Sequence, residues 1–173
     1  MAIGRNLFII SFLATASSVA VAESSVTLKQ VNSPLTITQY STAFQEETSS
    51  SRYSSGNPDQ IMHSVSYTNS SSKNIVALQI GLASFDAFNG FMGRFSGWAT
   101  ERVAVGETKK GEWNQRPYAA FSFKDYGTGV AYVNAVRFED GSIWRANLKE
   151  VLSEMQKFEK DLKAEDLAEK KGK

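Results

Sequence analysis

Few side chains in this sequence could do chemistry. The chain of 173 residues has no cysteine and a single histidine, His63. Thiol catalysis, thiolate metal sites and a Cys–His dyad are therefore excluded, and a Ser-His-Asp triad would have to use His63. His63 lies within an alternating apolar run, residues 61–67, and no G-x-S-x-G, P-loop or G-x-G-x-x-G motif occurs. This pattern favours a histidine satisfied within a strand over a catalytic base.

Carboxylates allow two other kinds of site. The candidate calcium ligands Asp86, Asp125, Glu139 and Asp140 lack the D-x-D-x-D spacing of a calcium loop. A carboxylate pair could also hydrolyse a glycosidic bond, and the sequence leaves that alternative open. Because no motif supports them, we predict no metal ion, no cofactor and no catalytic residue.

Aromatic side chains are the remaining candidates for a binding site. Between residues 88 and 98, glycines are spaced among Phe88, Phe91, Phe95 and Trp98, which favours an exposed loop. These side chains could stack on a sugar or form a groove for a peptide. The alternative is that they fill the interior, since a domain without disulfides needs a bulky core.

The elements that must position these residues are mostly strands. Runs with period-two alternation, separated by turn residues, predict a single domain over residues 23–146. We expect an all-β, immunoglobulin-like antiparallel sandwich of about seven or eight strands. The Ser-rich stretch 45–60 is expected to be a mobile loop, because it is polar and ends in Gly-Asn-Pro.

The end of the domain carries turn and helix signals. Asp140-Gly141 predicts a two-residue hairpin turn of type I′, with positive φ at both residues. Asn147 is then expected to cap a helix, with Glu150 completing a capping box. One apolar stripe follows at helical spacing: Leu148, Val151, Leu152, Met155, Phe158 and Leu162.

This predicted helix, residues 148–162, must be covered by something. We expect its first half to dock on the sandwich of the same chain, with the charged tail beyond Leu162 projecting into solvent. If the helix instead pairs with another chain, the interface candidates are Met155, Phe158 and Leu162. Two heptads fall short of a coiled coil, so a monomer is the prediction.

The N-terminus has the pattern of a secretory signal peptide. Arg5 precedes an apolar stretch, residues 7–16, and Ala20-Val21-Ala22 forms an A-x-A cleavage site. Cleavage after Ala22 leaves a chain with 18 basic and 18 acidic residues. We therefore expect a periplasmic or secreted protein with no remaining transmembrane segment and no excess positive charge to attract nucleic acid.

Three short motifs resemble a known family. They are the turn Asn69–Lys73, the strand end Phe85-Asp86 and the turn Val105-Gly106-Glu107. Together they are similar to the FxLYD type of immunoglobulin-like domain in small exported bacterial proteins. The strand end departs from the usual Tyr-Asp, and the second turn lacks proline. The resemblance implies a fold and an envelope setting, and it carries over no catalytic residue.

The function expected from the sequence is a non-enzymatic exported binding or structural module that acts on a protein or another envelope component. The first alternative is a small carbohydrate-binding protein that uses the aromatic stretch 88–98. The second alternative is a carboxylate-based hydrolase.

Export gives the first test. Intact-mass analysis of the protein from the envelope fraction should show a chain that begins at Glu23, because small residues occupy both recognition positions before it. A full-length chain in the cytosol would contradict the signal-peptide interpretation.

Overall fold

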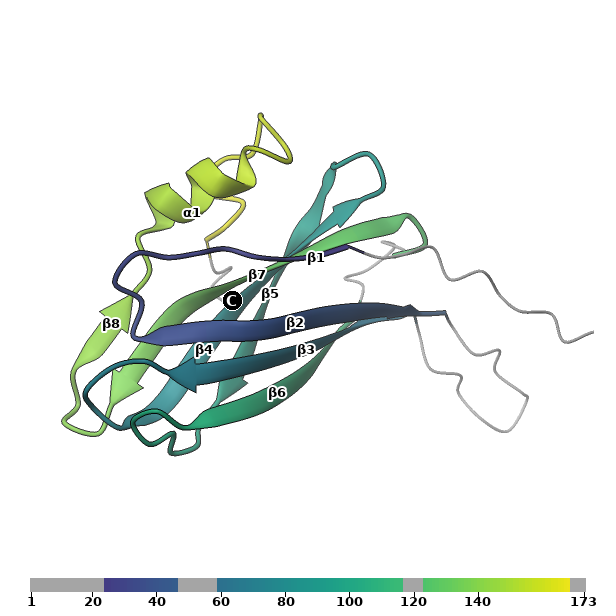
Figure 1. Cartoon of the computed structure of the whole chain (residues 1–173). Coiled ribbons are helices and arrows are strands. Elements are labelled where there is room, and N and C mark those ends of the chain that lie inside the picture. The colour runs from purple at the N-terminus through teal and green to yellow at the C-terminus, as the bar shows by residue number, and fades with distance from the viewer. Residues whose placement is uncertain (1–23, 47–58, 117–122, 169–173) are drawn as a thin grey trace, which may run out of the picture.

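The computed structural model describes residues 24–46, 59–116 and 123–168, which contain eight strands and one helix (Figure 1). The elements are, in chain order, β1 (Ser24–Thr27), β2 (Leu35–Gln45), β3 (Gln60–Asn69), β4 (Ile75–Asp86), β5 (Phe91–Ala99), β6 (Thr108–Gln115), β7 (Tyr126–Phe138), β8 (Ile143–Arg145) and α1 (Leu148–Met155). One sheet has the order β1-β7-β4-β5, with β8 also paired to β7. The other sheet has the order β2-β3-β6.

The two sheets face each other around one main core, to which both contribute buried side chains. The predicted all-β sandwich with a C-terminal helix is therefore confirmed. The order β2-β3-β6 opposite β5-β4-β7 corresponds to strands A-B-E opposite C′-C-F in immunoglobulin-like domains. Figure 1 shows α1 on the side of the larger sheet that faces away from the smaller one.

The burial of each strand follows from what covers its two faces. In β3, buried residues alternate with more exposed ones, because only its inner face meets the core. In β4, every residue from Leu78 to Phe85 is buried. Its inner face meets the core, and its outer face contributes Ala83 and Phe85 to a second cluster under Val151 and Met155 of the helix. The sequence of β4 is a continuous apolar run because both of its faces are covered.

The free edge of β7 is covered by three different segments. Its first part pairs in parallel with β1, and its last part pairs with β8. Between them, the side chain of Gln30 takes the place of a strand. Its Nε2 donates to the carbonyl of Val133 at 2.9 Å, and the Val133 N–H donates to its Oε1 at 2.7 Å. The backbone of β7 is thereby satisfied where neither neighbouring strand reaches it.

The predicted hairpin exists, but its turn differs from the prediction. Phe138 N–H donates to the carbonyl of Ser142, and Gly141 N–H donates to the carbonyl of Phe138. Gly141 has the expected positive φ of 83°, whereas Asp140 does not. The loop is therefore three residues long and ends in a left-handed glycine. The Asp140 carboxylate accepts from the N–H of Ser142 and from the ammonium of Lys73, which fixes the turn.

The helix begins where predicted and ends early. Asn147 caps it, since its Oδ1 accepts from the N–H of Lys149 at 3.1 Å. Glu150 bonds the Asn147 side-chain amide rather than its backbone, so the capping box is incomplete. The helix ends at Met155, not at residue 162.

The prediction of a projecting tail is wrong. Leu162 is 3% exposed and Leu167 is 1% exposed, and both belong to the cluster beneath the helix. A continued helix would have carried Leu162 roughly 10 Å past Met155 along its axis. The chain instead turns back over the same patch, and the Gln156 side chain donates to the carbonyl of Leu162 at 2.9 Å.

Most of the predicted Ser-rich loop lies outside the described residues. Its two ends are parts of strands. Gln45 closes β2 and Gln60 opens β3, and the Gln60 side chain donates to that of Gln45 at 2.6 Å.

The Gln30 bridge predicts a specific loss of stability. Gln30→Ala leaves both polar groups of Val133 without their partner, so the free energy of unfolding should fall by about 1–3 kcal/mol in a urea titration. Gln39→Ala, at an exposed position of β2, is the matched control and should change it by less than about 0.5 kcal/mol. Equal effects of the two substitutions would contradict the bridging role.

Candidate functional site

The four aromatic candidates do not form one surface. Residues 91–98 belong to strand β5 rather than to an exposed loop, which corrects the prediction. Phe85 pairs with Phe91 and Ser84 pairs with Gly93, so Met92 is an extra residue in a bulge. The bulge directs Phe91 toward the helix side, where it meets Phe85 edge-to-face at 5.5 Å.

The glycines of this stretch have structural reasons that the sequence does not reveal. Gly93 has a φ of 138° within the bulge. Gly97 and Gly111 accommodate the ring of Trp113, because a Cβ would lie 2.5 Å and 2.2 Å from it, respectively. The indole N–H of Trp113 donates to the carbonyl of Trp98 at 3.1 Å. Glycine here allows a close approach of strand and ring rather than forming a loop.

Phe95 is part of the core and lies beside the only histidine. The rings of His63 and Phe95 are stacked with centroids 6.3 Å apart, and Tyr40 stacks on the other side at 6.1 Å. His63 is 1% exposed. Its Nδ1 lies 3.0 Å from the Tyr40 hydroxyl and its Nε2 lies 3.1 Å from Oε1 of Gln115. The prediction of a satisfied, buried histidine is confirmed.

Hydrogen bonding fixes the protonation state of His63. Oε1 of Gln115 is an amide oxygen without a hydrogen, so it accepts from the imidazole, as it also accepts from the hydroxyl of Ser84 at 2.9 Å. Nε2 therefore carries the proton, and Nδ1 accepts from Tyr40. Burial lowers the pKa of His63 to about 4, and the bond to Gln115 opposes this shift only in part.

A second tyrosine completes this buried group. The hydroxyls of Tyr40 and Tyr126 converge over Gly129, where a Cβ would lie 2.4 Å and 2.5 Å from the two oxygens. Burial, together with the interaction with Tyr126, holds the pKa of Tyr40 well above its usual value. The group is neutral, links both sheets and is almost completely buried, which favours a structural role.

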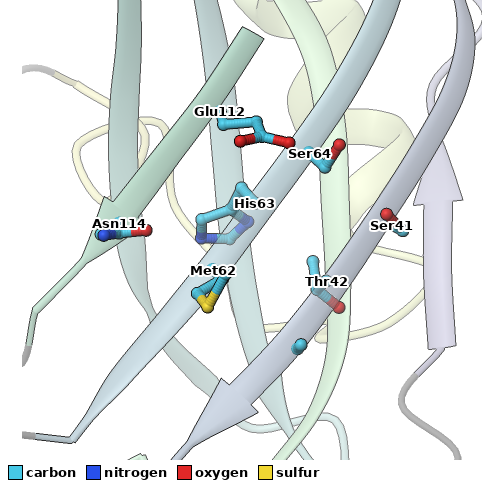
Figure 2. A pocket seen from close by; sticks show the side chains of 8 residues that line it. Ser41, Thr42, Met62, His63, Ser64, Glu112 and Asn114 are labelled. Atoms are coloured by element: carbon cyan, nitrogen blue, oxygen red, sulfur yellow. The ribbon is translucent and has the colours of Figure 1, made fainter. Parts of the chain in front are cut away.

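A shallow hollow of about 490 Å³ lies on the outer face of the smaller sheet (Figure 2). Its side chains come from β2, β3 and β6 and include Ser41, Met62, Ser64, Glu112 and Asn114. Glu112 is the one carboxylate of the lining, and it pairs with Lys110 at 2.6 Å. His63 also lines the hollow, but it is 1% exposed and both its ring nitrogens are bonded to Tyr40 and Gln115, so the two serines have no imidazole partner. The hollow is a polar surface without an acid–base pair.

Phe88 lies in the turn at the tip of the β4–β5 hairpin and is 94% exposed. Figure 1 shows this hairpin extending past the body of the sheet. Oδ1 of Asp86 accepts from the N–H groups of Phe88 and Gly90, both at 2.8 Å. Asn89 adopts a φ of 68°, and Ala87 N–H donates to the carbonyl of Asp125 at 2.9 Å. A well-bonded backbone thus holds a phenyl ring in solvent.

The helix candidates lie in the body of the fold. Met155 and Leu162 are buried in the cluster under the helix, and Phe158 stacks on Phe85 at 5.4 Å. This placement matches the expectation that the first half of the helix docks on its own chain.

No group of three His, Cys, Asp or Glu side chains within the described residues could hold a metal ion. No helix there has both the length and the apolar character needed to span a bilayer.

Comparisons with known proteins give little beyond this geometry. No protein-family model matches the sequence, and no curated protein matches it. A crystal structure of a hypothetical protein from Peptoclostridium difficile 630 is similar with a TM-score of 0.46 and 13% identity, over 73% of this chain and 92% of that one. A target of the Northeast Structural Genomics Consortium is similar with a TM-score of 0.40 and 15% identity, over 65% and 80%.

The exposed aromatics Phe88 and Trp98 were candidates from the sequence, whereas the partners of the buried His63 were not predicted. Tyr40 and Gln115 bond His63, and Ser84 bonds Gln115. The three residues come from three different strands, and no local pattern relates them. The signal that existed was chemical, because a histidine on an apolar strand face must find hydrogen-bonding partners among other strands.

The buried imidazole predicts a pH-dependent stability. The folded pKa of about 4 lies below the unfolded value of about 6.5, so the unfolded chain binds more protons between these values. The contribution of the neutral imidazole to the free energy of unfolding is therefore fully present above about pH 6.5 and is lost as the pH drops toward 4. From about pH 7.5 to about pH 5 the free energy of unfolding should fall by about 2 kcal/mol in urea titrations. His63→Gln should remove most of this slope, and an equal slope in both proteins would contradict the assignment.

Proposed function

We propose that this protein is a non-enzymatic exported binding module that docks a protein partner through the tip of its β4–β5 hairpin. The observation that carries the proposal is Phe88, which is 94% exposed on a turn held by Asp86. The partner is expected to offer an apolar pocket that accepts a phenyl ring.

The rigidity of the turn supports this role. Because these bonds already fix the backbone of the turn, little backbone freedom is lost on binding, so more of the contact energy is available as affinity. A phenyl ring at full exposure also removes a large apolar area from water when it enters a pocket. Gly90 allows the Asp86 carboxylate to approach the turn backbone this closely, because a Cβ at position 90 would lie 2.6 Å from Oδ2 of Asp86.

The surfaces described above favour binding over hydrolysis. Within the described residues, the hollow on the smaller sheet has one carboxylate, and the only imidazole is engaged in the core. The signal-peptide pattern supports a partner in the periplasm or outside the cell.

Site-specific photo-cross-linking in living cells tests the proposal. Phe88→p-benzoyl-phenylalanine should give a discrete adduct with another protein. Val31→p-benzoyl-phenylalanine is the matched control, because Val31 is 79% exposed on a different loop, and it should not give that adduct. With the partner identified, Phe88→Ala should weaken its affinity by about tenfold or more. The free energy of unfolding of the Phe88→Ala variant should differ from that of the wild-type protein by less than about 0.5 kcal/mol.

Absence of an adduct at position 88, or the same adducts from both positions, would refute docking through the hairpin tip.

A further inference from the structure

The outer face of edge strand β5 carries a second exposed aromatic side chain beside an arginine. Arg94, Ser96 and Trp98 alternate along this strand, so they share one face. Their partners across β4 are Ala83, Gly81 and Gln79. Trp98 is 60% exposed, whereas the inner face of the same strand is closed by Phe95.

Arg94 is fixed in place without a counter-charge. Its Nε donates to the hydroxyl of Tyr132 at 2.7 Å, and its guanidinium carbon lies 5.8 Å from the centre of that ring. No carboxylate of the described residues lies within ion-pair distance of this half-buried guanidinium. A guanidinium forms its strongest hydrogen bonds with a carboxylate or phosphate, which it can hold in a bidentate manner. The terminal nitrogens of Arg94 are therefore oriented and available to accept one.

The fold brings this guanidinium toward Trp98. The ring of Tyr132 lies over Gly81, where a Cβ would be 2.1 Å from it. Gly81 is opposite Ser96, one strand repeat of about 7 Å from the Trp98 pair. The guanidinium held by Tyr132 thus lies about one strand repeat from the residue pair that carries the exposed indole.

We propose that Arg94 and Trp98 form a binding site for an acidic saccharide. The indole of Trp98 stacks on the face of a pyranose ring, and the guanidinium of Arg94 binds its carboxylate in a bidentate manner. The site is separate from the hairpin tip, and it does not depend on the role proposed for Phe88.

The first experiment changes the ligand and leaves the protein intact. The mature protein is applied to an immobilised panel of oligosaccharides that carry uronic, sialic or muramic acid, with neutral oligosaccharides of the same length as controls. Acidic members should be retained and neutral members should not. Carboxyl reduction of the best ligand should weaken its affinity at least tenfold by calorimetry. Retention of no acidic member, or equal affinity for the reduced ligand, would overturn the proposal.

The second experiment changes the protein. Trp98→Ala and Arg94→Gln should each weaken the affinity for the acidic ligand by tenfold or more, and Trp98→Phe should keep most of it. Arg102→Gln, which removes an exposed arginine elsewhere, should keep wild-type affinity. Arg94→Gln should lose its preference for the acid over the reduced ligand even if its melting temperature falls. An unchanged preference in this variant would exclude Arg94 as the anion contact.

Discussion

The pairing of β4 with β7 is the constraint on which the rest of the structure depends. These two long strands form the centre of the larger sheet, and both are buried on both faces over most of their length. The inner face needs the second sheet, and the outer face needs a cover. In a chain without cysteine, no disulfide can compensate for an uncovered face. The helix and the turns that return Leu167 to the sheet are the consequence.

The same constraint explains the polar groups in the interior. Leaving a buried amide or hydroxyl without a partner costs roughly 1–3 kcal/mol. Each polar side chain in the core therefore needs hydrogen-bonding partners that are also in the core. His63, Gln115 and Ser84 satisfy one another across the two sheets, and Gln30 satisfies the backbone of Val133 at the edge. Polar side chains therefore help to set the register of strands that are distant in sequence.

Much of the fold could be predicted from the sequence because it is encoded locally. Period-two alternation revealed the strands, Asn147 marked the helix start, and Gly141 marked the hairpin. The features that could not be predicted depend on contacts between distant segments. The bulge at Met92, the close approach of Trp113 to Gly97 and the reversal after Met155 each have their cause in a neighbouring strand or cluster.

The candidate binding residues also fall into those that were predicted from local sequence and those that depend on contacts between distant segments. Phe88 and Trp98 are exposed, as the sequence predicted for this aromatic stretch. Phe91 and Phe95 are not, because the bulge at Met92 directs Phe91 to the helix side of the sheet and leaves Phe95 against the main core. The pairing of Arg94 with Tyr132 was invisible because the two residues are 38 positions apart.

The parallel pairing of β1 with β7 also determines how the domain responds to tension. Ser24 is opposite Thr128, so the two strands run in the same direction from that end. A force that pulls upstream of β1 and downstream of β7 acts along the strands in opposite senses. It loads the ladder and the Gln30 bridge in shear, so these hydrogen bonds must break together rather than one after another. A chain tethered in this way would resist extension until the whole β1 segment detached in a single step.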